Sequence, residues 1–352
     1  MGSGFKSQGV HEIPVSFSRG TGIFLLWQSI RVTESIAFEN LSTEAQIASL
    51  ASCVQGILGQ FDLDVAGFES INHGFNSTFK VTTAAGDPFA LRVNVNSTKT
   101  LENLRAEVQW VSSIRSVKVP TPIANKSGEF ITFAHHAASG RTLPAVLFSW
   151  LEGEEVGDDP TVENLFAAGA AMAKLHIESK DLTFDSTATL PLIDSVLWGA
   201  EDHLVGDDGV FTGEERELVE HAYGEIQSIL DRQLTENKPQ PIHADLHGWN
   251  LMWHEGEIAV FDFDDAMVST PLIDLATALY YLDTEDQEQS WIQGYKSVAP
   301  LMNFSDREMA TLKIQRRLVL LNYILETSNP EHKAIIPEYQ AKTLTRLKAL
   351  FE

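Results

Sequence analysis

Apolar and polar positions follow the periods of helices and strands over residues 43–150. Thr43-x-x-Gln46 is typical of a capping box and predicts a helix start. Short apolar runs bounded by turn residues predict five strands, at residues 68–72, 78–83, 88–94, 129–135 and 145–150. Apolar residues at three- and four-residue spacing predict a helix over residues 99–114. Strands, one main helix and further strands in this order indicate a small α+β domain.

The remainder of the chain is mostly helical by the same criteria. Leu165, Ala168, Met172 and Leu175 recur on one helical face, and Gly169 within that helix indicates close packing against a neighbouring helix. Three more stretches with helical periodicity lie at residues 214–234, 291–301 and 312–325. A chain of 352 residues normally forms two domains or lobes. We therefore expect a helical second domain over residues 151–352.

A short hairpin interrupts the helical part. Residues 251–253 and 258–261 are strand-like apolar runs, and Glu255-Gly256 between them is a turn signal. Folding the chain about this turn brings Asn250 and Asp262 nearly opposite one another, about 5 Å apart at Cβ. Two oxygen donors at that separation suit a small hard cation such as Mg²⁺.

Just before the hairpin, the chain reads His243-x-Asp245-x-x-x-x-Asn250, and Asp262 follows the hairpin. These side chains suit a nucleotide phosphotransferase, in which Asp245 takes a hydroxyl proton while Asn250 and Asp262 hold Mg²⁺. Alone, an Asp or Asn in a loop is usually a turn or cap residue. The three-part spacing around a hairpin is what favours the catalytic interpretation.

Residues 242–279 resemble the aminoglycoside phosphotransferase and choline kinase family of protein-kinase-like small-molecule kinases. Bacterial homoserine kinases and a bacterial stress-response Ser/Thr kinase are also members, and Asp262-Phe263-Asp264-Asp265-Ala266 is most similar to the latter. The resemblance implies a two-lobed kinase fold of class α+β over residues 43–350, with ATP in the cleft. The smaller N-terminal lobe, residues 43–150, would hold an antiparallel sheet, one main helix and the nucleotide. The C-terminal lobe, residues 151–352, would hold the catalytic loop, the metal site and the acceptor pocket.

The resemblance also assigns roles near the catalytic loop. Asp274 would pin the loop through backbone hydrogen bonds, and His243 would brace it. His176 would be structural. His247 and Trp249 would line the acceptor side, although packing explains them equally well. Two roles are equally compatible with Asp264. It could bind the metal or a water molecule, or it could accept a hydrogen bond from a group that itself contacts the metal.

On the nucleotide side, the resemblance implies a role for Gly74 and Asn76 in a loop over the phosphates, although an ordinary turn is equally compatible. Arg92 stands where most relatives have a phosphate-binding Lys, and its planar fork suits phosphate. Glu107 would orient Arg92 through an ion pair. Glu102 is the competing carboxylate, and we favour Glu107 because it lies beside the apolar stripe. Residues 146–153 would form the hinge, where the backbone of Ser149, Trp150 and Leu151 contacts adenine.

Composition narrows the possible partners. The formal charge of −24 argues against nucleic acid and anionic membranes. The acidic surface would favour cationic substrates, but solubility explains it equally well. The single cysteine, Cys53, excludes an intramolecular disulfide framework and fits the cytoplasm. No apolar run is long enough to span a membrane and no signal peptide is apparent. Residues 1–42 carry few periodic signals and form a poorly defined extension, and Arg316 and Arg317 start no basic patch.

Three functions are compatible with these features. The leading hypothesis is an ATP- and Mg²⁺-dependent kinase that phosphorylates a hydroxyl of an amino alcohol, a hydroxy amino acid or an aminoglycoside. The alternatives are a Ser/Thr protein kinase of the stress-response type and a nucleotide-binding module without catalysis. The intact set of Asp245, Asn250 and Asp262 argues against the last. The sequence leaves open the acceptor, the choice between ATP and GTP, and the oligomeric state.

Overall fold

The computed structural model describes residues 37–326 and 330–352, whose contacts divide the chain into two compact units. The first unit contains the described residues up to 100 together with residues 120–150. The second contains residues 101–119 and the described residues from 151 onward. Of the expected N-terminal extension, residues 1–36 lie outside the described residues. The part that is described includes η1 (Phe38–Asn40), whose Phe38 is buried in the core of the first unit.

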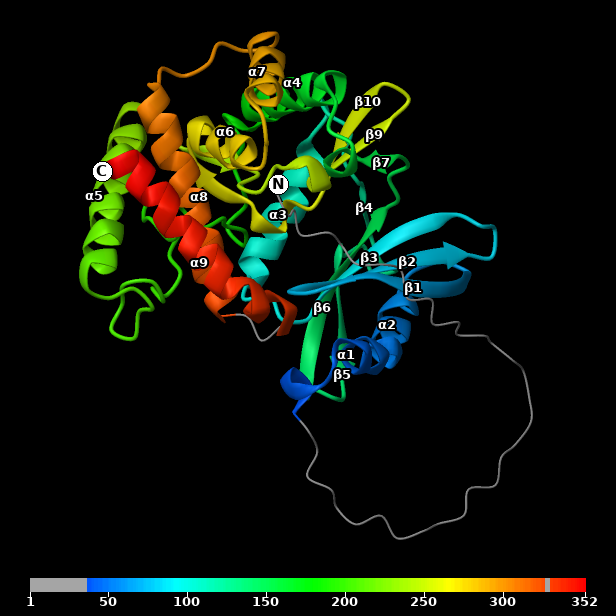
Figure 1. The fold of residues 1–352 in the computed structure, drawn as a ribbon. Coiled ribbons are helices and arrows are strands. Elements are labelled where there is room, and N and C mark those ends of the chain that lie inside the picture. The colour runs from blue at the N-terminus through cyan, green and yellow to red at the C-terminus, as the bar shows by residue number, and fades with distance from the viewer. Residues whose placement is uncertain (1–36, 327–329) are drawn as a thin grey trace. The chain divides into compact units, whose positions relative to one another are not determined.

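An antiparallel sheet forms the first unit. Its strands follow the order β1-β2-β3-β6-β4, and β5 also pairs with β6 (Figure 1). The strands are β1 (Val65–His73), β2 (Asn76–Thr83), β3 (Pro88–Asn94), β4 (Pro122–Ile123), β5 (Ile131–His136) and β6 (Arg141–Ser149). The five strands expected from the sequence are present. The two-residue β4 is additional and too short to leave a periodic signal.

Two short helices, α1 (Thr43–Ser49) and α2 (Ala51–Leu58), replace the single helix expected at residue 43. The N-cap is Ser42, whose hydroxyl accepts the Ala45 amide at 3.3 Å, so the capping box expected at Thr43 is wrong by one residue. Ser42 has the extended backbone that a cap requires, whereas Thr43 is already helical. Cys53 is buried in the core, and burial raises the pKa of its thiol, which makes it an unreactive core residue.

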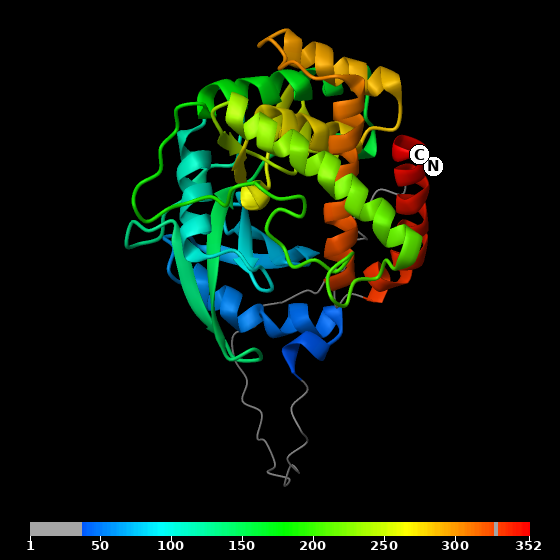
Figure 2. The same cartoon turned by 90° about the vertical axis from the view of Figure 1, so that its left-hand side faces the viewer.

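The second unit is mainly helical and includes α3, the helix that the sequence analysis placed in the first domain. Its helices are α3 (Leu101–Ser113), α4 (Val162–Ser179), α5 (Gly213–Glu236), α6 (Pro271–Tyr280), α7 (Glu285–Lys296), α8 (Asp306–Glu326) and α9 (Pro330–Phe351). Helix α8 contacts α5, α6 and α9 (Figure 2). The helix expected at residues 291–301 begins six residues earlier, at a capping box of Thr284 and Gln287. Its first two turns are too polar to show apolar periodicity.

Two small sheets in the second unit frame the segment that contains Asp245. In one, β7 (Glu154–Glu155) and β10 (Glu257–Val260) flank β9 (Leu251–His254). In the other, β8 (Gln240–Ile242) pairs with β11 (Met267–Ser269). The Glu255-Gly256 turn joins β9 to β10, and both residues have positive φ, at 51° and 83°. This confirms the hairpin expected from the sequence.

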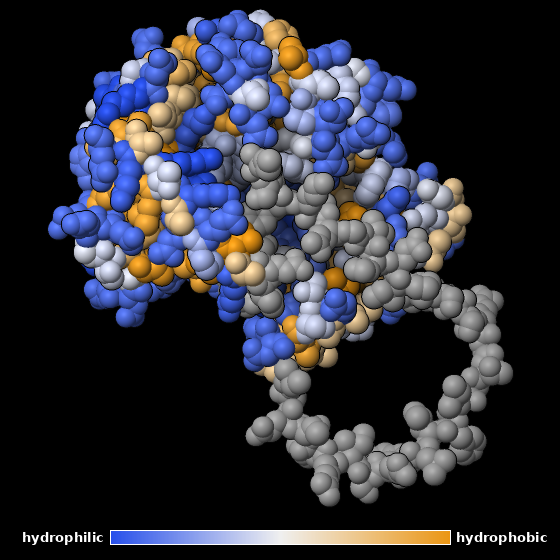
Figure 3. Space-filling model, viewed as in Figure 1, coloured by the Kyte–Doolittle hydropathy of each residue, from blue (hydrophilic) through white to orange (hydrophobic). Residues whose placement is uncertain are grey.

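Hydrophilic side chains cover most of the face shown in Figure 3, and hydrophobic side chains form only small groups between them. Over the described residues, no helix is long and apolar enough to cross a membrane.

Helices α4 and α7 approach so closely that glycine is required on both. A Cβ atom at Gly169 of α4 would overlap the carbonyl oxygen of Trp291, and one at Gly294 of α7 would overlap that of Phe166. Each glycine therefore receives the backbone of the opposite helix. The close packing expected at Gly169 is confirmed, and its partner is α7.

Replacing Gly169 or Gly294 by alanine is expected to destabilise the protein by about 1–3 kcal/mol, because overpacked backbone must move apart. Gly224→Ala in α5 is the matched control, since a Cβ atom there meets nothing within 4 Å. That variant should gain about 0.5–1 kcal/mol from the higher helix propensity of alanine. Chemical denaturation measures the free energy of unfolding of all three variants. Equal stability of Gly169→Ala and Gly224→Ala would contradict the packing.

Candidate active site

The loop after β8 begins with a backbone conformation that its neighbours must hold. Ala244 has a φ of 62°, in the left-handed region that residues other than glycine rarely adopt. Asp274, in the first turn of α6, accepts the Ala244 amide through Oδ1 at 2.8 Å and the His243 amide through Oδ2 at 3.2 Å. These two bonds to one buried carboxylate fix the direction in which the chain enters the loop.

Asp274 is held in turn by two buried side chains. His176 Nε2 lies 2.9 Å from Asp274 Oδ2, and the Tyr295 hydroxyl lies 3.0 Å from His176 Nδ1. Burial, and then the charge of Asp274, raises the pKa of Tyr295, so its hydroxyl stays protonated and can donate to Nδ1. His176 then donates from Nε2 to the carboxylate. This arrangement makes His176 a link in the support of Asp274.

His243 connects the loop to the end of the hairpin. Its Nε2 donates to the carbonyl oxygen of Phe261 at 3.0 Å, and its ring packs 4.7 Å from that of Phe263. A carbonyl oxygen can only accept, so Nε2 carries the proton. The side chain is thus engaged in bracing the loop against β10.

The register of the hairpin places Asn250 opposite Phe261. Leu251 pairs with Val260, and the Phe261 amide donates to the Asn250 carbonyl oxygen at 3.1 Å. Asp262, expected nearly opposite Asn250, lies one residue farther along the chain. It has left-handed backbone angles of 60° and 61°, which turn the chain at the point where β10 has ended.

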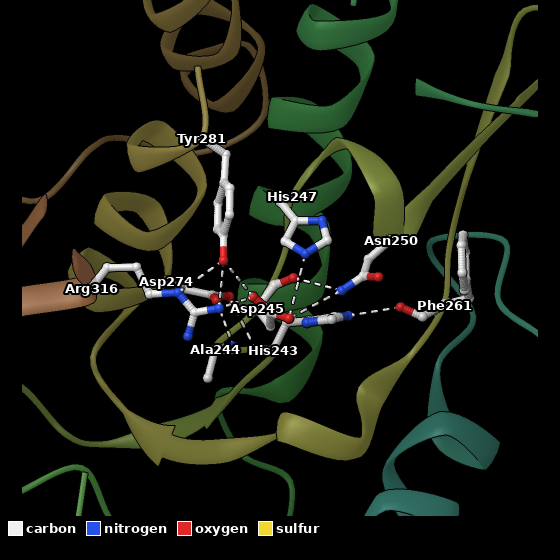
Figure 4. Close-up of polar contacts among 9 residues, drawn as sticks. All are labelled: His243, Ala244, Asp245, His247, Asn250, Phe261, Asp274, Tyr281 and Arg316. Carbon is white, nitrogen blue, oxygen red and sulfur yellow. Dashed lines mark hydrogen bonds and ion pairs between the residues drawn. The ribbon is translucent and has the colours of Figure 1, made fainter. Parts of the chain in front are cut away.

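Asp245 lies at the centre of the polar contacts in Figure 4. Its Oδ1 pairs with Nη2 of Arg316, and its Oδ2 lies 3.5 Å from both His247 Nε2 and Asn250 Nδ2. Asn250 Nδ2 also donates to the Asp245 carbonyl oxygen at 2.8 Å. Burial acts to raise the pKa of the Asp245 carboxyl, but Arg316 and then His247 outweigh it and hold that pKa below its ordinary value. The carboxylate is therefore ionised.

Arg316 of α8 is a site residue that the sequence did not reveal. Its guanidinium also contacts the Tyr281 hydroxyl, with Nη2 at 2.7 Å and Nε at 3.2 Å. The guanidinium carbon lies 5.5 Å from the ring of Tyr281 and 5.3 Å from that of Trp198. Burial raises the pKa of Tyr281, so it acts as a neutral hydroxyl. One feature of the sequence could have identified Arg316 as a site residue: it stands inside the apolar run of a predicted core helix. A buried arginine needs a partner, so its position there indicates a specific contact.

His247 and Trp249 of the same loop have different surroundings. The His247 ring lies 4.6 Å from that of Tyr281, beside Asp245. Trp249 packs against η2 (Val156–Asp158), where a Cβ atom at Gly157 would lie 2.5 Å from the indole ring. Packing therefore accounts for Trp249, whereas His247 faces the carboxylate.

Asp264 and Asp265 belong to η4 (Phe263–Asp265), after the hairpin. Their charges act on Tyr323 of α8, where burial and then Asp265 and Asp264 raise the pKa of the phenol. This places both carboxylates in the electrostatic surroundings of α8. Either role expected for Asp264 is compatible with that position.

The donors present fit a small hard cation. Asn250 uses Nδ2 for its bonds to Asp245, and within the described residues its Oδ1 accepts no hydrogen bond. An amide oxygen in that state is a suitable ligand for Mg²⁺. Over the described residues, no group of three or more His, Cys, Asp or Glu side chains could enclose a metal. A cation held mainly by water and phosphate oxygens is consistent with this sparse set.

The residues expected to bind nucleotide are divided between the two units. Gly74 lies in the turn between β1 and β2, where its carbonyl oxygen accepts Asn96 Nδ2 at 3.0 Å. Asn76 begins β2 and pairs with Asn94. Arg92 is buried in β3, and its guanidinium carbon lies 5.6 Å from the Phe148 ring.

The expected partner of Arg92 belongs to the second unit. Glu107 is buried in α3, whereas Glu102 at the start of that helix is exposed. Burial favours Glu107 as the carboxylate with a specific partner, since ionised groups are rarely buried unpaired. Its pairing with Arg92 stays a prediction.

The hinge begins where β6 ends. The Ser149 amide donates to Thr121 O at 2.8 Å, and Ser149 Oγ accepts the Thr121 amide at 2.9 Å. These bonds fix the end of β6 just before Trp150 and Leu151. Their contact with adenine stays a prediction.

Solved structures share this fold at low sequence identity. An amicoumacin kinase in complex with AMP-PNP and Ca²⁺ aligns with a TM-score of 0.68 and 15% identity, covering 86% of this chain and 96% of that one. A microcompartment-associated aminopropanol kinase aligns with a TM-score of 0.66 and 23% identity, covering 84% of this chain and 95% of that one. The fold is that of the protein-kinase-like phosphotransferases, with the expected α+β class.

The model of the "Phosphotransferase enzyme family" matches residues 67–301. The chain therefore belongs to that family and is an ATP-dependent phosphotransferase. Among characterised proteins, it is 26% identical to a homoserine kinase of Neisseria meningitidis serogroup B, over 70% of this chain and 79% of that protein. It is 22% identical to an amicoumacin kinase of Bacillus subtilis, over 55% of this chain and 56% of that protein.

Replacing Asp274 by alanine is expected to destabilise the protein by about 3 kcal/mol or more, because two loop amides and His176 lose their buried hydrogen-bond acceptor. Asp207→Ala, at an exposed aspartate in a loop, is the control and should change stability by less than about 0.5 kcal/mol. Urea denaturation at neutral pH measures the free energy of unfolding of both variants. Similar stabilities of the two variants would contradict the role of Asp274 as the anchor of the loop.

Proposed function

We propose that the chain transfers the γ-phosphate of ATP to a hydroxyl of a small molecule at Asp245. The observation that supports this most strongly is the state of that carboxylate. It is ionised, contacted by Arg316, and set in a loop whose backbone Asp274 holds.

Asp245 would accept a hydrogen bond from the acceptor hydroxyl and align its oxygen with the γ-phosphate. The transition state of phosphoryl transfer is loose, so orientation and charge neutralisation supply most of the rate enhancement. A carboxylate with a lowered pKa is a weak base. It suits a step in which the proton leaves the hydroxyl late, as the bond to phosphorus forms.

Asn250 and Asp262 would hold Mg²⁺ through side-chain oxygens. When bound, the cation would neutralise charge on the phosphates of ATP. The contribution of the chain is to fix these two ligands at the base of a rigid hairpin. The bond from Asn250 Nδ2 to the Asp245 carbonyl oxygen sets the orientation of one of them.

The nucleotide would be bound by the residues that the resemblance to kinases implies. Gly74 and Asn76 would lie over the phosphates, and Arg92, oriented by Glu107, would grip them. The backbone of residues 149–151 would contact adenine. The resemblance to kinases supports these assignments, and so does the burial of Arg92 and Glu107.

The acceptor would be an amino alcohol, a hydroxy amino acid or an aminoglycoside. Similarity to proteins named homoserine kinase and amicoumacin kinase supports a small molecule. The acidic balance of the chain supports the absence of nucleic acid and membrane partners. The single cysteine and the use of ATP support a cytoplasmic location.

Purified protein with Mg·ATP is expected to release ADP only in the presence of a suitable acceptor. The panel comprises L-homoserine, choline, ethanolamine, sugars, aminoglycosides and a generic protein. Asp245→Asn should lower kcat at least about 100-fold, since the amide cannot accept the proton. Its KM for ATP should change little, because in this proposal Asp245 contacts the acceptor hydroxyl and not the nucleotide. Full activity of Asp245→Asn, or turnover with the protein alone, would contradict the proposal.

Removing the proposed metal ligand Asn250 is expected to raise the Mg²⁺ concentration needed for half-maximal activity. Asn250→Ala would show this in a magnesium titration at saturating ATP, and EDTA should abolish wild-type activity. Asn303→Ala, at an exposed asparagine, is the control and should match the wild type. An unchanged magnesium requirement in Asn250→Ala would exclude that residue as a ligand.

A further inference from the structure

One donor of the Arg316 guanidinium has no partner among the described residues. Nη2 and Nε contact Asp245 and Tyr281, but Nη1 forms no hydrogen bond within the described part of the chain (Figure 4). The next residue in α8 differs. Arg317 is also buried, and each of its three nitrogens has a partner, in Thr343, Tyr280 and the carbonyl oxygen of Tyr339.

Trp198 supplies a second unused donor beside the same guanidinium. Its ring lies 5.3 Å from the Arg316 guanidinium carbon, and its indole Nε1 is buried without a partner among the described residues. Trp198 also has a φ of 57°, a left-handed conformation that is a genuine outlier for a bulky side chain. Strain of this kind persists where the surroundings enforce it, and it clusters at ligand-binding positions.

We propose that Arg316 and Trp198 form a subsite for a carboxylate on the acceptor, which rests on the function proposed above. An arginine and an indole N–H can only donate, so a ligand group that binds both of them must accept. A guanidinium binds carboxylate in preference to neutral acceptors and repels the ammonium groups of an aminoglycoside.

The position of the subsite limits the size of the acceptor. Nη1 and Nη2 share one carbon atom, and Nη2 contacts the carboxylate of Asp245. In the proposed function, the reacting hydroxyl binds at that carboxylate. The acceptor carboxylate is therefore separated from the hydroxyl by only a few bonds. The acceptor is thus a small hydroxy acid, and among the acceptors proposed above the hydroxy amino acids are the class that carries such a carboxylate.

Pairs of acceptors that differ only in the carboxylate test this directly. The pairs are L-homoserine with 3-amino-1-propanol, L-threonine with 1-amino-2-propanol, and L-serine with ethanolamine. For the pair that is turned over, the wild-type protein should use the amino acid with a kcat/KM at least about tenfold higher, as expected for hydrogen bonds to a charged group. Kanamycin completes the panel as an acceptor without a carboxylate.

The ratio of kcat/KM within a pair separates recognition of the carboxylate from general damage to Asp245. Arg316→Gln should lower activity with both members and bring the ratio close to one. Arg317→Gln, the matched control, should keep the wild-type ratio. Trp198→Phe retains the ring but removes the N–H, and it should raise the KM for the amino acid by about tenfold while the KM for ATP stays unchanged.

Each outcome bears on the subsite. A ratio near one in the wild type, or a ratio that Arg316→Gln and Trp198→Phe both preserve, overturns it. Turnover of kanamycin or of amino alcohols alone also overturns it while the proposed phosphotransfer stands. If the wild type turns over no acceptor, the proposed function fails together with the subsite. If thermal unfolding shows that Arg316→Gln does not fold, the test rests on Trp198→Phe and on the kcat/KM ratios of the wild-type protein.

Discussion

The contact between Asp274 and the backbone of the loop that carries Asp245 is the constraint on which the candidate site depends. It holds Ala244 in a conformation that the residue would not adopt alone, and the next residue is Asp245. His176 and Tyr295, from α4 and α7, fix the carboxylate in turn. The close crossing of these two helices, which Gly169 and Gly294 permit, therefore contributes to the position of Asp245. In this way the helical core determines where a reactive group lies in a loop.

The second determinant is the balance of charge around Asp245. Burial acts to raise the pKa of this carboxyl, and the charge of Arg316 opposes that effect and holds the pKa below its ordinary value. The same arginine is flanked by Tyr281 and Trp198. In the proposed subsite, ionisation of the carboxylate and recognition of the acceptor would therefore depend on one side chain of α8.

Local features of the sequence were predicted well because they depend on neighbouring residues. The Glu255-Gly256 turn, the strands beside it and five of the six strands of the first unit follow from turn chemistry and apolar periodicity. The sequence does not reveal the start of α7, because its first two turns are polar. The predicted helix cap, Thr43, lies one residue after the observed cap, Ser42. Arg316 could not be assigned because it meets Asp245 across 71 residues of sequence. Periodicity shows that α8 is a helix but not which loop its arginine contacts.

The central claim is that the loop carrying Asp245 transfers phosphate to an alcohol. Phosphorus NMR of the protein with Mg·ATP and L-homoserine, followed over time, tests it most directly. We expect a phosphate monoester signal to grow in step with ADP in the wild type and to be absent with Asp245→Asn. Formation of ADP with inorganic phosphate alone, or equal ester formation by the variant, would contradict the account.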